Sequence, residues 1–143
     1  MKISKAVIED APYIAEIELQ VFGVRNVEKI ESDIKNSNYT YYVLTNDSGT
    51  IVSYISVLVA GECADIIMVV TDRLYRGRGY ATILMDGVIG ALKERNVKDV
   101  FLEVRENNDV AKRLYKRFGF QPISIRKKYY DGTIDGIVMK LSI

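Results

Sequence analysis

The residues best suited to chemistry in this chain form a short turn, Arg76-Gly77-Arg78-Gly79-Tyr80-Ala81. An apolar run precedes the turn and a helical pattern of apolar residues follows it, so it joins a strand to the N-terminus of a helix. Unpaired backbone N–H groups and the positive end of the helix dipole make such a place an anion site. Glycines let a phosphate approach the backbone, and arginines add positive charge. The turn predicts a site for a phosphate-bearing cofactor, although a simple connecting loop would have the same composition.

The residue types that are missing limit the chemistry further. The chain has no histidine and one cysteine, Cys63. Mechanisms built on a histidine base and histidine-ligated zinc sites are therefore excluded, and we expect no metal. Acid–base chemistry must fall to carboxylates, tyrosines, lysines or water. One cysteine cannot form an internal disulfide and favours a reducing compartment, and no neighbour activates its thiol, so we interpret Cys63 as structural.

Length and composition describe one ordinary globular domain over residues 1–143. Hydrophobic residues make up 48% of the chain and charged residues 27%, which is typical of such domains. The net charge of +1 supplies no bulk attraction to nucleic acid or to an anionic membrane. No apolar run approaches the roughly 18 residues of a membrane span, and Met1-Lys2-Ile3-Ser4-Lys5 leads into charged residues rather than a long apolar signal core. We therefore expect a cytoplasmic protein without nucleic-acid or membrane partners, of unknown oligomeric state.

Hydrophobic periodicity predicts the elements that position the turn. Strands are expected at Ile3 to Ile8, Tyr39 to Leu44, Ile51 to Val59, Ala64 to Thr71, Asp99 to Arg105, Phe120 to Lys128 and Thr133 to Ile143. Helices are expected from an Asp10 cap with Pro12 in the first turn to Gly23, at Val27 to Lys35, at Thr82 to Arg95, and from an Asn107–Asp109 cap to Gly119. The order βααβββαβαββ, with a parallel strand–helix–strand crossover around the turn, predicts an α/β domain with a mixed sheet.

A dinucleotide is one alternative ligand for the turn. Gly77-Arg78-Gly79 could open a dinucleotide fingerprint, but Thr82 occupies the third glycine position. A hairpin precedes the turn and too little chain follows for a doubly wound sheet, which disfavours this alternative. The Gly-Lys-Ser/Thr sequence of a phosphate loop is absent, so a nucleotide hydrolase is disfavoured as well.

Two separated motifs carry a resemblance to a known family. Arg76-x-x-Gly79-x-Ala81 resembles the acetyl-CoA motif of the GNAT N-acetyltransferase superfamily. A second segment, Asn108-x-x-Ala111-x-x-Leu114-Tyr115-x-x-x-Gly119-Phe120, resembles the second cofactor-binding segment of that superfamily. The resemblance implies a GNAT-like mixed sheet of about seven strands with about four flanking helices.

The C-terminal part narrows the resemblance to the RimI-type N-terminal acetyltransferases. The segments that carry it are Leu102–Arg105, Ile125–Tyr130 and Asp135–Met139. The N-terminal half departs from the pattern, because Phe22–Asn26 stands where the family often has Pro-Trp after the first helix. That segment helps to bind substrate in the family, so the resemblance leaves the identity of the acceptor open.

The resemblance assigns cofactor-binding residues. Backbone amides of the turn would bind the pyrophosphate of acetyl-CoA, with side-chain charge from two arginines; the residues are Arg76, Gly77, Arg78, Gly79, Tyr80 and Ala81. The strand edge at Val69, Val70 and Thr71 would bond the pantetheine arm. Asn108 would bond the cofactor, cap its helix, or do both.

The resemblance also assigns catalytic and substrate residues. Glu103 would be the general base, directly or through water, and Tyr115 would protonate the departing thiolate. Without the family, a strand glutamate paired with a cation and a core tyrosine are the simpler interpretations. An α-amine of pKa near 8 is about one-tenth neutral at pH 7, so it demands little of the base. Tyr129 and Tyr130 would line a groove for the substrate peptide, or belong to a solvated hairpin.

The predicted function is acetyl transfer from acetyl-CoA to the α-amine of a protein N-terminus. The RimI-type enzymes act on the N-terminal alanine of a ribosomal protein, so the resemblance implies a protein or peptide partner of that kind. Two alternatives stay open. One is a GNAT enzyme that acetylates lysine, a polyamine or another small amine, and the other is a non-catalytic CoA-binding sensor or scaffold.

Overall fold

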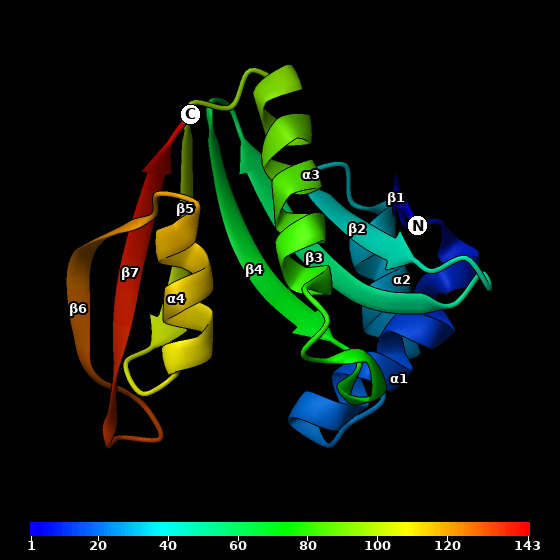
Figure 1. Ribbon diagram of the computed structural model, residues 1–143, viewed down its shortest axis with the longest axis horizontal. Coiled ribbons are helices and arrows are strands. Elements are labelled where there is room, and N and C mark those ends of the chain that lie inside the picture. Colours follow the sequence, from blue (N-terminus) through cyan, green and yellow to red (C-terminus); the bar gives the residue numbers. More distant parts are fainter.

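Seven strands form one mixed sheet in the order β1-β2-β3-β4-β5-β7-β6 (Figure 1), in a computed structural model that describes residues 1–143. Only β4 and β5 are parallel, and all other neighbours are antiparallel. The strands are β1 (Lys2–Lys5), β2 (Tyr39–Thr45), β3 (Ile51–Ala60), β4 (Cys63–Thr71), β5 (Asp99–Arg105), β6 (Gln121–Tyr130) and β7 (Ile134–Ser142). The predicted α/β class and the predicted order of elements are confirmed.

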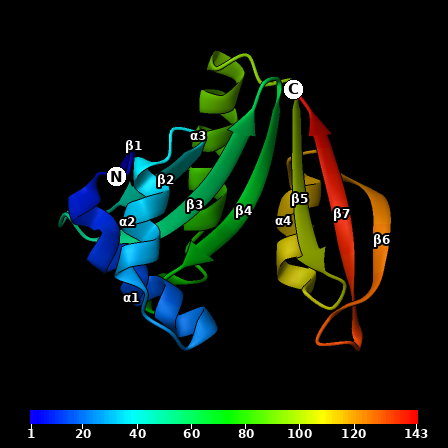
Figure 2. The ribbon, with the colours of Figure 1, turned by 180° about the vertical axis from the view of Figure 1, so that it is seen from behind.

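Helices cover both faces of this sheet. α1 (Ala11–Phe22) and α2 (Val27–Lys35) lie on one face, and α3 (Tyr80–Glu94) and α4 (Asp109–Arg117) on the other (Figures 1 and 2). The larger core lies beneath α3 and α4, where Leu84, Val88 and Tyr115 meet strand residues. A smaller core lies beneath α1 and α2, around Ile14 and Tyr54. None of the helices is both long and apolar enough to cross a membrane.

The sheet opens at its centre. β4 and β5 pair only between residues 63–65 and 99–101. Beyond these residues β4 pairs with β3 alone and β5 with β7 alone, and the two strands diverge (Figure 2). Backbone groups on the β5 side of residues 66–71 therefore have no strand partner, which leaves them available to a ligand.

A β-bulge in β4 sets which side chains face this opening. Ile67 is the extra residue between Ile66 and Met68, whose partners on β3 are adjacent. Because side chains alternate along a strand, one extra residue reverses the alternation after it. Val69 thus packs against the α3–α4 core, while Met68 and Val70 pack on the α1–α2 side. The bulge therefore decides that Val69, rather than Met68 or Val70, faces the α3–α4 core.

Predicted boundaries fail where side chains make local bonds. The first strand ends at Lys5 rather than Ile8, because residues 8–10 form the 3₁₀ turn η1 (Ile8–Asp10). Asp10 is the N-cap residue of α1, as predicted. Its carboxylate makes no bond to α1, however, and instead accepts a bond from the Val7 N–H at 2.9 Å. Gly23 ends α1 in the left-handed region at φ 71°, as predicted.

Candidate active site

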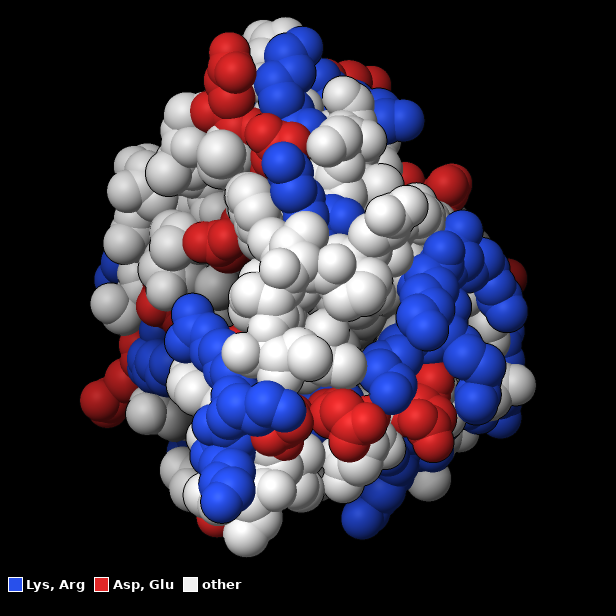
Figure 3. All heavy atoms as spheres, turned by 90° about the vertical axis from the view of Figure 1, so that its left-hand side faces the viewer, with Lys and Arg blue, Asp and Glu red and all other residues white.

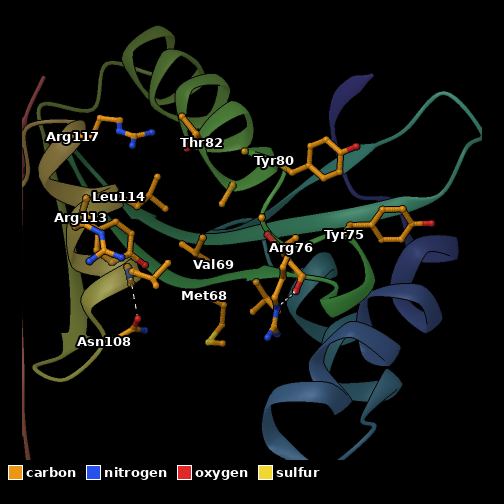
Figure 4. A pocket seen from close by; sticks show the side chains of 18 of the residues that line it. Met68, Val69, Tyr75, Arg76, Tyr80, Thr82, Asn108, Arg113, Leu114 and Arg117 are labelled. Atoms are coloured by element: carbon orange, nitrogen blue, oxygen red, sulfur yellow. Dashed lines mark hydrogen bonds between the residues drawn. The ribbon is translucent and has the colours of Figure 1, made fainter.

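A cavity of about 750 Å³ lies at the opening between β4 and β5. Its walls come from the end of β4, the following turn, the first turn of α3 and one side of α4 (Figure 4). The predicted site residues that line it are Val69, Val70, Thr71, Arg76, Gly77, Gly79, Tyr80, Ala81, Asn108 and Tyr115. The fold thus brings the two sequence motifs to one cavity. Four of the predicted residues do not line it: Arg78, Glu103, Tyr129 and Tyr130.

The turn before α3 presents a row of free backbone donors. None of the N–H groups from Arg76 to Thr82 donates a hydrogen bond to a backbone acceptor outside the regular elements. Gly77 and Gly79 have φ of 78° and 79°, a left-handed conformation that glycine adopts without strain. Gly79 is also the N-cap of α3, so the helix begins two residues before the predicted Thr82. Converging N–H groups at a helix N-terminus fit a phosphate or diphosphate.

The two arginines of the turn differ in position. Arg76 lines the cavity, and its Nε donates a 3.0 Å hydrogen bond to the Thr71 carbonyl at the end of β4. Arg78 lies outside the cavity, with its guanidinium 5.4 Å from the centre of the Tyr75 ring. Arg76 therefore couples the turn to the strand edge, while Arg78 contributes charge from further away.

Tyr115 connects the cavity with the core. The side chain is 8% exposed, and its ring meets Phe120 edge-on at 5.9 Å between centroids. Burial, with a smaller effect of Tyr130, raises the pKa of Tyr115 to about 12. The hydroxyl thus stays protonated and can donate a hydrogen bond into the cavity. Core packing and a chemical role are compatible for this residue.

Asn108 begins α4 at the cavity rim. Its side-chain oxygen accepts a 3.1 Å hydrogen bond from the Ala111 N–H, which is the capping arrangement expected from the sequence. The residue also lines the cavity. The amide N–H₂ of this cap has no partner in the protein, so it can serve a ligand.

Glu103 lies on the other face of the sheet. Its neighbours Leu102 and Val104 are buried beneath α3 and α4, so strand alternation turns Glu103 toward the α1–α2 side. Its Oε1 lies 3.0 Å from the Arg126 Nε. This oxygen is buried and has no hydrogen-bond partner. The contact with Arg126 is therefore an ion pair without hydrogen-bond geometry. Within the protein itself, Glu103 is therefore a strand glutamate paired with a cation, which is the simpler of the two interpretations.

Tyr129 and Tyr130 surround this carboxylate. The two rings meet edge-on at 5.1 Å, and Arg126 lies 5.1 Å from the Tyr129 ring centre. A Cβ at Gly136 would come within 3.2 Å of both the Glu103 Oε1 and the Tyr130 ring, so glycine makes room for this packing. Burial, followed by the charge of Glu103, raises the pKa of Tyr130. These residues form a charged and aromatic cluster on β5, β6 and β7.

Sequence reasoning missed much of the cavity wall. The lining residues outside the two sequence motifs and the predicted site are Val21, Met68, Tyr75, Thr82, Val110, Arg113 and Arg117, while Ala111 and Leu114 of the second motif also line the cavity. Val110, Arg113 and Arg117 recur at helical spacing and form one stripe of α4. That spacing could have revealed the stripe, whereas the bulge that orients Met68 leaves no recognisable pattern.

Comparisons with known proteins agree with this geometry. The sequence pattern of the Acetyltransferase (GNAT) family matches residues 10–120. The ribosomal protein bS18-alanine N-acetyltransferase of Escherichia coli (strain K12) is 31% identical over 144 residues, which cover 99% of this chain and 97% of that protein.

Solved structures show the same fold. The ribosomal-protein-S18-alanine N-acetyltransferase from Escherichia coli superposes with a TM-score of 0.90 at 29% identity, covering 99% of this chain and 93% of the other. The PaiA N-acetyltransferase from Thermoplasma acidophilum, in complex with coenzyme A, has a TM-score of 0.82 at 18% identity, covering 99% and 98%.

Proposed function

The chain belongs to the acetyltransferase (GNAT) family and is an acetyl-CoA-dependent N-acetyltransferase, and we propose that its acceptor is the α-amine of a protein N-terminus. The observation that carries this proposal is the similarity to the bS18-alanine enzyme over 99% of the chain. That similarity includes the N-terminal helices, which flank the opening from the face opposite α3 and α4. A ribosomal protein is accordingly the first acceptor to test.

The proposed cofactor site uses the free donors of the turn. The N–H groups from Arg76 to Thr82 and the Arg76 side chain would hold the diphosphate, because they are unpaired and positively polarised. The unpaired edge of β4 at Val69 to Thr71 would bond the pantetheine arm in the manner of a strand. When bound, acetyl-CoA supplies a thioester whose carbonyl carbon the acceptor amine attacks. No residue of the chain has to form a covalent bond.

The acceptor is proposed to enter from the α1–α2 face. Val21 lines the cavity, and Phe22 and Val24 beside it are exposed apolar side chains that a peptide could cover. Glu103 and its aromatic cluster lie on the same face across the opening. Glu103 would take a proton from the incoming ammonium group, directly or through water, since a carboxylate with only one cationic partner can accept another.

Tyr115 is proposed as the donor to the leaving sulfur. A Cys-like thiol has a pKa of about 8.5, whereas that of Tyr115 is about 12, so full proton transfer to a solvated thiolate would be uphill. Burial raises the pKa of a thiolate as well, which narrows this difference inside the cavity. A hydrogen bond from the Tyr115 hydroxyl to the sulfur therefore lowers the barrier before the proton moves.

An acceptor panel tests the proposed function. The enzyme is incubated with acetyl-CoA and a peptide that begins with alanine and contains an internal lysine, and thiol release is followed. Mass spectrometry then locates the acetyl group. We expect thiol release with acetylation at the α-amine. Acetylation of the lysine alone, or turnover with spermidine but not with the peptide, would contradict the proposal.

The matched control is the same peptide with a blocked N-terminus. It keeps the lysine and the rest of the sequence, so loss of turnover assigns the reaction to the α-amine. Binding of acetyl-CoA without release of thiol from any acceptor would instead favour a sensor or scaffold.

A further inference from the structure

One stripe of α4 lines the cavity opposite α3. Val110, Arg113 and Arg117 belong to it, and Figure 4 shows the Arg117 side chain extending from α4 toward Thr82 on α3. Val110 is 72% exposed, so it offers apolar surface to a ligand in the cavity. This stripe lies on the cofactor side of the sheet, away from Glu103 and the acceptor face.

The arginines of this stripe have no acidic partner. Neither Arg113 nor Arg117 takes part in any ion pair of the protein. Lys112 on the same helix pairs with Asp109 at 3.6 Å. The helix dipole favours a cation in the last turn and so accounts in part for Arg117. It does not account for Arg113, one turn earlier.

The surface around α4 is basic. Figure 3 looks onto β6 and the flank of α4, and Lys and Arg gather along the edge where α4 lies. Four of the nine residues of α4 are Lys or Arg. A protein of net charge +1 thus concentrates positive charge beside its cofactor cavity. Such a field attracts a polyanion and strengthens its binding.

Coenzyme A carries two separate anionic groups, a diphosphate and a phosphate on the 3′-oxygen of its ribose. The turn before α3 accounts for the diphosphate, and this inference rests on that proposed placement. We propose that Arg113 and Arg117 bind the ribose 3′-phosphate, so that the enzyme distinguishes CoA from 3′-dephospho-CoA. Guanidinium groups suit this task because they donate paired hydrogen bonds to phosphate oxygens. Val110 on the same stripe supplies apolar surface for the adenine ring.

Calorimetric titration with CoA and with 3′-dephospho-CoA tests the proposal. We expect wild-type protein to bind CoA about tenfold more tightly, which is the effect of two partly exposed charge-assisted contacts. In the double variant Arg113→Gln/Arg117→Gln the ratio should fall to about one, with the affinity for 3′-dephospho-CoA nearly unchanged. Because the arginines are exposed, the wild-type ratio should shrink in high salt.

Lys116→Gln is the matched control. It removes one positive charge from the same helix at a residue that does not line the cavity, so the ratio should stay close to the wild-type value. Unfolding temperatures of all variants should agree with wild type, since the exchanged side chains are exposed.

Three results would overturn the inference. They are equal affinity of wild-type protein for the two ligands, an unchanged ratio in the double variant, and an equal loss of affinity for both ligands in that variant. If neither ligand binds wild-type protein, the cofactor site fails together with this inference. If the acceptor panel fails while the affinity ratio behaves as expected, only the proposed acceptor is wrong.

Discussion

The two sides of the opening between β4 and β5 are built from different parts of the chain. On the α3–α4 side, backbone N–H groups of one continuous turn and the free edge of one strand form the cavity wall. On the α1–α2 side, the polar groups are side chains from separate strands, as in the pair between Glu103 and Arg126. The N–H groups of the turn have no partner within the protein and are free to bind a ligand. The Glu103 carboxylate, by contrast, already faces the positive charge of Arg126.

This difference affects how each side can bind a ligand. Unpaired N–H groups are held by the helix and cost little to reorganise when a phosphate arrives. A carboxylate that already faces an arginine must share or exchange its partner before it serves an amine. We therefore expect cofactor affinity to tolerate side-chain changes other than those at the arginines of the turn and of α4, while turnover depends on individual side chains at the opening.

Tyr115→Phe should produce the largest effect, because it removes the hydroxyl that we propose as the donor to the leaving sulfur. We expect kcat to fall about 100-fold, while the affinity for acetyl-CoA stays close to that of wild type. Single-turnover kinetics and calorimetry measure the two quantities. A normal kcat would leave Tyr115 as a core residue only.

Glu103→Gln should have a smaller effect that depends on pH. We expect kcat/KM to fall about tenfold at pH 7. An amine with a pKa of about 8 is mostly protonated at pH 7 and therefore needs a base, whereas at pH 9 it is mostly neutral. The deficit should shrink as pH rises through that pKa. A control is Glu106→Gln, an exposed residue just beyond β5. A deficit that is constant between pH 7 and 9 would contradict the role of Glu103 as a base.

Gly79→Ala tests the backbone side of the comparison. Its φ of 79° lies in the left-handed region, so a Cβ there should cost about 1–2 kcal/mol in the free energy of unfolding and weaken CoA binding several-fold. Gly90→Ala is the matched change in the interior of α3, where a Cβ meets no atom within 4 Å. It should raise stability by up to about 1 kcal/mol. Urea unfolding measures the stability of both variants, and titration measures their affinity for CoA. Unchanged CoA affinity in Gly79→Ala would contradict the proposal that the turn binds the cofactor.

Tyr54→Phe should have the smallest effect at pH 7. The Tyr54 hydroxyl is buried without a hydrogen-bond partner, so its removal should be nearly neutral. Burial, followed by the charge of the buried Glu18, raises the pKa of Tyr54. Above a pH of about 10 the Tyr54 hydroxyl therefore loses its proton in the unfolded chain but keeps it in the folded protein. The free energy of unfolding then falls by up to about 1.4 kcal/mol per pH unit.

The variant should consequently lose less stability than wild type between pH 10 and 12, as measured by thermal unfolding. An equal alkaline loss in both proteins would show that Tyr54 does not contribute. Neither result bears on the cofactor side, which makes this variant a test of the α1–α2 face alone.

Local patterns predicted most of the fold and the turn that joins β4 to α3. The glycine that ends α1 and the asparagine that caps α4 act on their immediate neighbours, so Gly23 and Asn108 were predicted correctly. Asp10 occupies the predicted N-cap position but makes no capping bond, because its carboxylate accepts a hydrogen bond from the preceding Val7 N–H instead. Arg113 and Arg117 were missed because a basic stripe on a short helix resembles any solvated surface.

The amino-acid sequence by itself determined the order of elements, the turn rich in glycine and arginine, and the chemistry left to a chain without histidine. These features depend on residues close together in the chain and on composition. The tertiary structure alone decided that β4 and β5 separate, that a bulge at Ile67 reorients the end of β4, and that Glu103 lies on the face opposite Tyr115. Those outcomes depend on pairing between distant strands, where one residue of register changes the face that every later side chain occupies.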